Sequence, residues 1–335
     1  MSIDDRGPEL AIFVSLFLGL SIVTIALRCY VRARMLNIFQ VEDWLAVIAT
    51  ICFVLYCTAV MISIQHGAGK RYNHVDVQEI RKVLQMRWAG EICYIVTSLF
   101  LKFTVGVFLL RICSRRWHKV TICSMLAVCL VYHIFYAFMT VFQCQPIAFY
   151  WGRYTGSTNG TCWSNDLITG STYAAAGLNA ITDWVLGLLP IALVRNLNLS
   201  RRSKILVSCT LALGSIASSA TLVRIGYIWQ LTQSSDFLYD FTDLAIWSTV
   251  ENGLGLVASS IATLRPLIRL IFGGAPAEIT PPPPRSFLSW RRSGTVAVHY
   301  RTRSGTQQYY RMGDFHHHKF PELVRVHDRR FSGVG

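Results

Sequence analysis

Charged residues are scarce in this sequence. Only 15% of the 335 residues are Asp, Glu, Lys or Arg and 53% are hydrophobic, whereas water-soluble domains carry roughly a quarter charged residues. Acidic residues are the scarcer sign, with 18 against 32 basic residues and a formal net charge of +14. This balance excludes an ordinary water-soluble globule. The basic residues lie mostly at the ends of apolar runs and in the last 70 residues, which favours a membrane protein over one that binds nucleic acid.

The sequence also lacks a convincing cleavable signal peptide and any run that alternates apolar and polar residues. The N-terminal flank MSIDDRGPE is acidic rather than basic, and RCYVRAR follows the first apolar run where a small-residue cleavage site would be needed. Most cysteines fall inside apolar runs, where cysteine usually acts as a small hydrophobic residue. We therefore expect the first apolar run to be a membrane helix rather than a processed leader.

Seven segments approach or exceed the roughly 18–20 apolar residues that a helix needs to cross a bilayer. They run over Leu10–Leu27, Trp44–Ile64, Trp88–Leu110, Val120–Phe142, Leu167–Val194, Ile205–Ile228 and Leu244–Leu264. A helix satisfies its backbone hydrogen bonds within the segment, which the bilayer interior requires. The sequence therefore predicts an all-α membrane protein built as a seven-transmembrane helix bundle.

Lysine and arginine in the connecting segments predict the orientation of the bundle. RCYVRAR, RICSRRWHK and RNLNLSRRSK follow the first, third and fifth segments and carry three, four and four basic residues, and the chain from Arg265 onward carries twelve. The connections on the other side carry one or none, except that the connection between Gln65 and Arg87 has five beside two acidic residues. Because cytosolic loops are enriched in Lys and Arg, we expect the N-terminus outside and the C-terminal tail in the cytosol.

These boundaries predict three parts: a short extracellular N-terminus over residues 1–9, a membrane domain over 10–270 and a tail over 271–335. The tail contains four prolines at Pro281–Pro284 and is rich in Ser, Gly, Arg and His, which predicts a disordered basic cytosolic extension. Such a tail either lies on anionic lipid or stays in solution, and its sequence favours neither. We interpret the triplet His316–His318 as solvated rather than as a metal site.

Short motifs occur in order along the whole predicted membrane domain. They are LRCYVRAR followed by EDW, HGAGKR, LKFTVGVFLLRI, FQCQPIAFYW with GTCW, LNAITDWVLGLLPI, KILVSCTLALGSIASSATLVRI and WSTVENGLGLVASSIATLRPL. In these motifs the chain resembles the fungal rhodopsin-like seven-transmembrane family, integral membrane proteins of filamentous fungi that are related to orphan receptor-like proteins. The resemblance covers residues 7 to about 270 and implies a receptor-like protein, and one group of the family is encoded beside secondary-metabolite genes.

A retinal cofactor is not expected, despite the name of that family. A retinal protein needs a lysine in its seventh helix for the Schiff base, and Leu244–Leu264 contains none. The usual receptor motifs are also missing, because LLRICSRR ends the third segment without an acidic-arginine-tyrosine triplet and TLRPLIRL ends the seventh without an Asn-Pro. Seven helices alone do not establish G-protein coupling. We expect no enzyme activity, because His133 is the only histidine clearly within a predicted helix.

Lys102 lies near the middle of the third segment, where an ammonium group must be compensated. At a rise of about 1.5 Å per residue, Lys102 lies roughly 13 Å from the cytosolic end at Arg111, and Asp183 lies about 18 Å from Arg195. The long lysine and the shorter aspartate could therefore pair near the midplane if the third and fifth segments are neighbours, joined by Asn179 on the same face as Asp183. The sequence leaves three readings open: a structural link between helices, a ligand site or switch, and an ion or proton path.

Glu91, Arg224 and Glu251 lie higher by the same measure, at roughly 20–30 Å from the cytosolic ends. This depth places all three in the outer half of the membrane, where Arg224 could bridge the two carboxylates. Ionisable groups at such depth are costly to bury and are functional candidates by default. The sequence therefore predicts an outer polar site in addition to the pair around Lys102.

Cys144 and Cys162 bracket a polar connection on the predicted outer side, CQPIAFYWGRYTGSTNGTC. Because the secretory pathway is oxidising, this position predicts a disulfide across the loop. The aromatic residues of the loop either form a lid over the helix ends or belong to the interfacial aromatic belt. Asn159 begins a glycosylation sequon, whereas a second sequon at Asn198 falls on the cytosolic side and is expected to stay unmodified.

Two functions follow from these observations. The first is a receptor-like protein that sits in the lipid bilayer of the plasma membrane or an endomembrane, binds an unknown small-molecule ligand and contacts a cytosolic signalling partner. The second is a transporter or auxiliary membrane protein of a secondary-metabolite pathway. The sequence shows no inverted repeat and no pair of broken helices that would favour transport.

Overall fold

The computed structural model of the chain describes residues 5–71, 75–113, 115–153, 159–195, 237–263, 300–301 and 307–308. The chain divides into two compact units, Met1–Pro276 and Ala277–Gly335, and each is described by itself. Within these ranges the first unit has six long helices: α1 (Gly7–Tyr30), α2 (Val41–Gln65), α3 (Val77–Ile112), α4 (Arg116–Val141), α6 (Asn165–Arg195) and α8 (Phe237–Thr263). The fold is therefore mostly helical, as predicted.

Four helical stretches are long and apolar enough to cross a membrane within the described part of the chain. They are Gly7–Met35, Val41–Gln65, Val77–Arg111 and Arg116–Val141. The first of them continues α1 through the π-helix η1 (Val31–Met35). Large apolar side chains on the outside of these helices are well exposed, with Ile12 66% and Val131 68% exposed, as lipid-facing side chains would be. The sixth predicted segment, Ile205–Ile228, lies outside the described residues, so the count of seven and the orientation stay predictions.

All six long helices begin earlier than the apolar runs indicate, and α3 and α8 differ the most. α3 begins at Val77 rather than Trp88, and α8 begins at Phe237 rather than Leu244. The added turns contain charged residues that a search for apolar runs excludes, although a helix outside the hydrocarbon layer tolerates them. The first turns of α3 also contribute Ile80, Val83 and Leu84 to a small buried apolar cluster.

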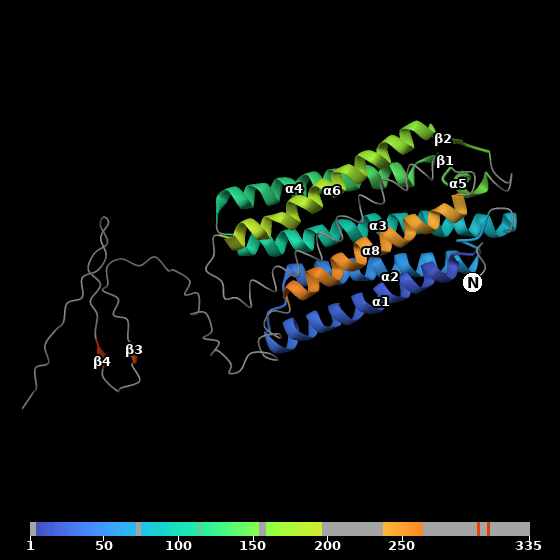
Figure 1. Cartoon of the computed structure of the whole chain (residues 1–335). Coiled ribbons are helices and arrows are strands. Elements are labelled where there is room, and N and C mark those ends of the chain that lie inside the picture. Colours follow the sequence, from blue (N-terminus) through green and yellow to red (C-terminus); the bar gives the residue numbers. More distant parts are fainter. Residues whose placement is uncertain are drawn as a thin grey trace, which may run out of the picture. The chain divides into compact units, whose positions relative to one another are not determined.

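α3 lies at the centre of the helical unit, in contact with α2, α4, α6 and α8. Figure 1 shows α8 (orange) beside α1, α2 and α3, while α4 and α6 pair on the opposite side of α3. The N-terminal end of α1 lies at the same end of this unit as α5 (Phe149–Gly152) and the strands β1 (Cys144–Gln145) and β2 (Thr161–Cys162) (Figure 1). We call this end the disulfide end.

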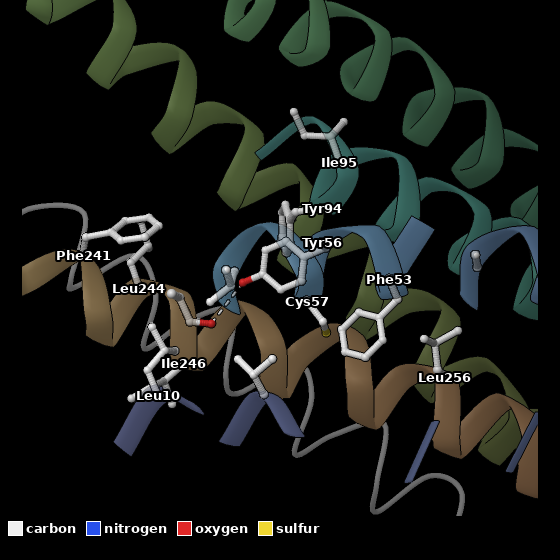
Figure 2. Close-up of a cluster of buried hydrophobic side chains, with 14 of the residues drawn as sticks. Leu10, Phe53, Tyr56, Cys57, Tyr94, Ile95, Phe241, Leu244, Ile246 and Leu256 are labelled. Carbon is white, nitrogen blue, oxygen red and sulfur yellow. Dashed lines mark hydrogen bonds between the residues drawn. The ribbon is translucent and has the colours of Figure 1, made fainter. Parts of the chain in front are cut away.

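The largest apolar core fills the space between α1, α2, α3 and α8. Figure 2 shows part of this core, including Leu10, Phe53, Tyr56, Cys57, Tyr94, Ile95, Phe241, Leu244, Ile246 and Leu256. The hydroxyl of Tyr56 donates to the carbonyl oxygen of Ala245 at 3.1 Å, so its polar end is satisfied within the core (Figure 2). Gly253 lets α8 approach α1 closely, because a Cβ there would lie 2.8 Å from Cδ1 of Phe17.

The disulfide end carries the predicted disulfide between Cys144 and Cys162. These cysteines pair across two short antiparallel strands, β1 (Cys144–Gln145) and β2 (Thr161–Cys162). Between the strands, the short helix α5 (Phe149–Gly152) packs its aromatic side chains against a buried cluster formed by the first turns of α3. Trp151 of α5 meets Trp88 of α3 edge-on, with 5.8 Å between ring centroids. These contacts hold the aromatic loop against the first turns of α3. The choice between a lid and an interfacial belt stays a prediction.

The described residues of the second unit form a minimal strand pair. β3 (Tyr300–Arg301) lies antiparallel to β4 (Gln307–Gln308). The composition of the tail does not predict this pair, because composition reports whether a packed core can form rather than whether two short segments can share hydrogen bonds.

Candidate functional site

Lys102 and Asp183 join α3 to α6 in the interior of the bundle. The Nζ atom of Lys102 contacts the carboxylate of Asp183 and also donates to the backbone carbonyl oxygen of Asn179 at 3.3 Å. Lys102 is 4% exposed, whereas the side chain of Asp183 is 25% exposed. The structure thus contains the pair that the depth estimate predicts, with a buried ammonium and a carboxylate at the edge of the protein interior.

Asn179 uses every hydrogen-bonding position of its side-chain amide. Its Oδ1 accepts from the hydroxyl of Tyr132 on α4 at 3.0 Å and from the hydroxyl of Ser98 on α3 at 3.3 Å. Its Nδ2 donates to Glu251 on α8 at 2.8 Å and to Asp183, one turn along α6, at 3.4 Å. An asparagine amide has two donor hydrogens and two acceptor lone pairs, so this side chain is saturated and its orientation is fixed.

Glu251 belongs to the same network. Besides the bond from Asn179, its two carboxylate oxygens lie 3.0 and 3.1 Å from the hydroxyl of Tyr94 on α3, and Glu251 is only 5% exposed. Depth along a helix gives the level of a residue in the membrane but not the neighbour that its helical face meets.

Glu91 of α3 contacts α4. Its Oε1 accepts a 3.0 Å hydrogen bond from the hydroxyl of Tyr136. Arg224, the third member of the predicted outer site, lies outside the described residues, so the proposed bridge between carboxylates stays a prediction.

We define the polar network as Lys102, Asp183, Asn179 and Glu251 with the hydroxyl residues Tyr94, Ser98 and Tyr132. The two tyrosines were not among the predicted site residues. A signal was present, because a buried tyrosine hydroxyl needs a hydrogen-bond partner, and Tyr94 and Tyr132 both stand within long apolar runs. The network links α3, α4, α6 and α8 through charged and polar groups. Separating the helices would leave these groups without hydrogen-bond partners in a low-dielectric interior, which is costly.

Two small cavities lie beside Tyr94, which lines both of them. The first, between α3, α4 and α6, is lined by Ser98, Tyr132, His133 and Asn179 among others. The Nδ1 atom of His133 lies 2.9 Å from the carbonyl oxygen of Cys129, which can only accept, so this nitrogen carries a proton. The second cavity lies between α2, α3 and α8, towards the disulfide end.

A second charged cluster, which the sequence analysis did not predict, lies at the other end of the bundle, where α1 gives way to α2. The side chains of Arg28 and Asp43 form an ion pair at 2.9 Å, and both are fully buried. Arg28 also donates to the backbone carbonyl oxygen of Ser259 at 3.0 Å, which ties α1 and α2 to α8. A buried ion pair of this kind is strongly destabilised when either partner is removed alone.

We call Arg28, Arg32, Arg111, Glu42 and Asp43 the arginine cluster. Two of its arginines contact Glu42. Its Oε1 lies 3.1 Å from Arg32, which follows α1, and 3.5 Å from Arg111 at the end of α3. The side chain of Arg111 is 49% exposed, so its contact is the weaker one. In the sequence, the arginines of this cluster serve only to predict orientation, and Glu42 and Asp43 appear only as part of the motif EDW. Opposite charges on either side of a short connection are the sequence signal for such a cluster.

At the disulfide end the N-terminal segment is fastened to α8. Arg6 donates to both carboxylate oxygens of Asp243, at 2.7 and 2.8 Å, and its backbone N–H donates to the carbonyl oxygen of Gly69 at 3.1 Å. The hydrogen bond to Asp243 raises the pKa of the Arg6 guanidinium, so the pair keeps its positive partner at any ordinary pH. Asn159 is exposed beside β2, where its side chain is accessible to modification.

Comparison with known proteins finds relatives that match most of the chain. The chain is 29% identical over 267 residues to the Wortmanamides biosynthesis cluster protein C of Talaromyces wortmannii, covering 77% of this chain and 70% of that protein. It is 23% identical over 279 residues to the Polyenoic acids biosynthesis gene cluster protein Ba17b of Metarhizium anisopliae, covering 79% and 75%.

A third relative is a SAT4 family membrane protein of Emericella nidulans, 25% identical over 214 residues that cover 63% of this chain and 53% of that protein. No solved structure gives a significant match. The model of the fungal rhodopsin domain matches residues 27–270, which include α2, α3, α4, α6 and α8 and every member of the polar network. The chain therefore belongs to the fungal rhodopsin domain family and is a membrane protein.

Proposed function

We propose that this chain is a receptor-like protein with seven transmembrane helices and an extracellular N-terminus, and that it responds to a small molecule without using retinal. The observation that supports this proposal is the saturated amide of Asn179, which ties four helices to the Lys102–Asp183 pair. A ligand that alters one bond of this amide must alter the others, because each position of the amide is already occupied.

Polar contacts between membrane helices also serve as packing links, each worth well under about 2 kcal/mol on average. Two features favour a conformational role over a purely structural one. The network combines an ammonium with two carboxylates in the protein interior, which is a costly way to hold helices together. The two cavities beside Tyr94 also give a bound molecule access to members of the network.

The second candidate is an auxiliary or transport protein of a secondary-metabolite pathway. The names of two relatives favour it, since each is a protein of a biosynthesis cluster. Those names also suggest which molecules to test first, namely polyenoic acids and amides such as the wortmanamides. In either role we expect a plasma-membrane or endomembrane location, which a fluorescent fusion would distinguish.

One experiment separates the two candidates. Cells that express the chain, and vesicles that contain it, are exposed to the same panel of polyenoic acids and amides. A receptor gives a ligand-dependent cytosolic signal and no flux of the compound into vesicles, and Lys102→Met abolishes that signal while the protein still reaches its membrane. Flux without a signal contradicts the receptor proposal. Leu178→Ala is the control, because Leu178 neighbours Asn179 but is 37% exposed.

A further inference from the structure

The cavity between α3, α4 and α6 has a wall whose side-chain hydrogen-bond donors are already used within the protein. We infer that this cavity binds the hydroxyl group of a neutral, largely apolar molecule, and that the hydroxyl donates a hydrogen bond to Nε2 of His133. The inference rests on the proposed function, because it names the chemical group that the receptor would recognise. It follows from three features of the wall: its occupied donors, one available nitrogen acceptor and an apolar remainder.

The hydroxyl groups of the wall each donate their single hydrogen to a carboxylate, to the amide oxygen of Asn179 or to a backbone carbonyl oxygen. They belong to Tyr94, Ser98, Tyr132, Tyr136 and Thr172. The Nδ2 hydrogens of Asn179 go to Glu251 and Asp183. Among the described residues that line the cavity, no side-chain donor is therefore left for a ligand. An ionised carboxylate or a phosphate, which can only accept, finds no side-chain partner in this wall.

His133 supplies the acceptor. It lines the cavity and is 4% exposed. Its Nδ1 donates to the carbonyl oxygen of Cys129, and an imidazolium would be costly in this buried interior, so the ring is neutral and Nε2 keeps a lone pair. Nε2 has no hydrogen bond among the residues that the structure describes. Because buried polar atoms are rarely left unpaired in native proteins, this lone pair calls for a donor.

The contacts of the His133 ring fix its orientation. Nδ1 is turned back onto the preceding turn of α4, where the sulfur of Cys129 lies 3.4 Å from it as a second, weak acceptor. One side of the ring packs against the ring of Tyr132, with 4.3 Å between centroids. The edge that carries Nε2 is therefore the part of the ring left to line the cavity.

The remainder of the wall is apolar and consists of Ile95, Ala175 and Ala176. The cavity is small and partly open, so it encloses one functional group while the apolar body of a ligand extends through the open side. A hydroxyl suits this space, because it is compact and needs only one acceptor. An amide adds a carbonyl oxygen that needs a donor, and an ammonium brings a charge and three N–H groups to a single available nitrogen.

The test compares three probes of similar length: hexan-1-ol, its isomer methyl pentyl ether, which has no donor hydrogen, and hexylamine. Binding to the full-length chain in lipid nanodiscs is measured by saturation-transfer difference NMR, with empty nanodiscs as the blank for partition into lipid. We expect the alcohol to bind at least about fivefold more tightly than the ether and the amine, as one neutral hydrogen bond allows. Equal or tighter binding of the ether or the amine would overturn the inference. No alcohol binding beyond the blank would also overturn it and would leave a cavity that holds water only.

Two variants assign the binding to His133. His133→Asn keeps an amide near the position of Nδ1 and has no atom at the position of Nε2. It should bind the alcohol about as weakly as the ether and should leave ether binding unchanged. Tyr173→Phe is the control, since the buried hydroxyl of Tyr173 has no partner among the described residues and Tyr173 does not line the cavity. A wild-type preference for the alcohol in His133→Asn, or loss of that preference in Tyr173→Phe, contradicts the assignment.

Filling the cavity gives an independent check with two neighbouring alanines of α6. Ala175 lines the cavity, whereas Ala174 is exposed and does not line it. Ala175→Leu should occupy the cavity and abolish alcohol binding, and Ala174→Leu should bind like the wild type. Unchanged alcohol binding in Ala175→Leu, or its loss in both variants, contradicts the assignment. If a variant at His133 or Ala175 does not fold, the variant at the other position decides the outcome.

The outcome for the ligand class is separable from the outcome for the receptor proposal. Alcohol binding without any ligand-dependent cytosolic signal would support the cavity assignment and contradict the receptor. A signal evoked by polyenoic acids or amides, with no alcohol binding, would support the receptor and overturn the hydroxyl assignment.

Discussion

The side-chain amide of Asn179 donates a 2.8 Å hydrogen bond to the carboxylate of Glu251, which joins α6 to α8 within the bundle. The same amide accepts from α3 and α4, so four helices meet at one planar group. Because Lys102 also donates to the backbone carbonyl of Asn179, the ion pair and the amide form one unit. Changes at any member should therefore be felt by the others.

We expect the protein to be destabilised both by removal of the Asn179 amide and by its replacement with a carboxylate. Asn179→Ala leaves Glu251, Tyr132 and Ser98 with unsatisfied polar groups, which we expect to lower the free energy of unfolding by about 1–3 kcal/mol. Asn179→Asp should lower it further, because it replaces two donors with acceptors that face carboxylates. SDS-induced unfolding in mixed micelles measures both. A stability of Asn179→Asp equal to that of wild type would contradict the described network, and Leu178→Ala is the neutral control.

The arginine cluster should show a strong contrast between two arginines. Arg28→Gln leaves the buried carboxylate of Asp43 without its main partner, which costs about 3–5 kcal/mol. Arg111→Gln removes a half-exposed contact to Glu42, which should cost under about 1 kcal/mol. The yield of folded protein in detergent and its thermal unfolding compare the two variants. Similar destabilisation by both changes would refute this ranking.

The loop disulfide should stabilise the disulfide end. Cys144→Ser removes a link that spans a sequence separation of 18 residues, and we expect a loss of about 3 kcal/mol in the free energy of unfolding. Reduction of the wild-type protein with dithiothreitol should give the same loss, and it should have no further effect on the variant. Cys123→Ser is the control, because Cys123 is a free and exposed thiol. Unchanged unfolding of the reduced protein would count against a structural disulfide.

Glycan mapping tests the proposed orientation. Asn159 is exposed and precedes β2 in the disulfide-closed loop, so treatment with a glycosidase should increase the gel mobility of the wild-type protein. Asn159→Gln should remove that shift, whereas Asn198→Gln should leave it unchanged. Asn198 lies outside the described residues, and its sequon is on the predicted cytosolic side. A glycan at Asn198 would contradict the predicted orientation and indicate the opposite one.

The sequence predicts the helical class and the Lys102–Asp183 contact for a clear physical reason. Apolar length sets which segments can cross a bilayer, and a fixed rise per residue converts sequence position into depth. An unpaired charge in the membrane interior is costly, so two opposite charges at similar depth are expected to pair when their helices are neighbours. The disulfide follows in the same way, from two cysteines in an oxidising loop.

Other contacts depend on information that depth does not carry. The bond between Asn179 and Glu251 depends on which helical faces are neighbours, and the tilt and rotation of each helix set that relationship. The ion pair between Arg28 and Asp43 is harder to predict from the sequence, because charges near helix ends are usually solvated or paired with lipid head groups. Their complete burial depends on the close packing of α1, α2 and α8 around them.

The central claim is that Lys102 and Asp183 act as one energetic unit, and a double-mutant cycle tests it most directly. The free energies of unfolding of Lys102→Met, Asp183→Asn and the double variant are measured by SDS titration in mixed micelles. We expect each single change to destabilise the protein and the double variant to lose at least 1 kcal/mol less than the sum of the two. Effects that add within about 0.5 kcal/mol would contradict the pair.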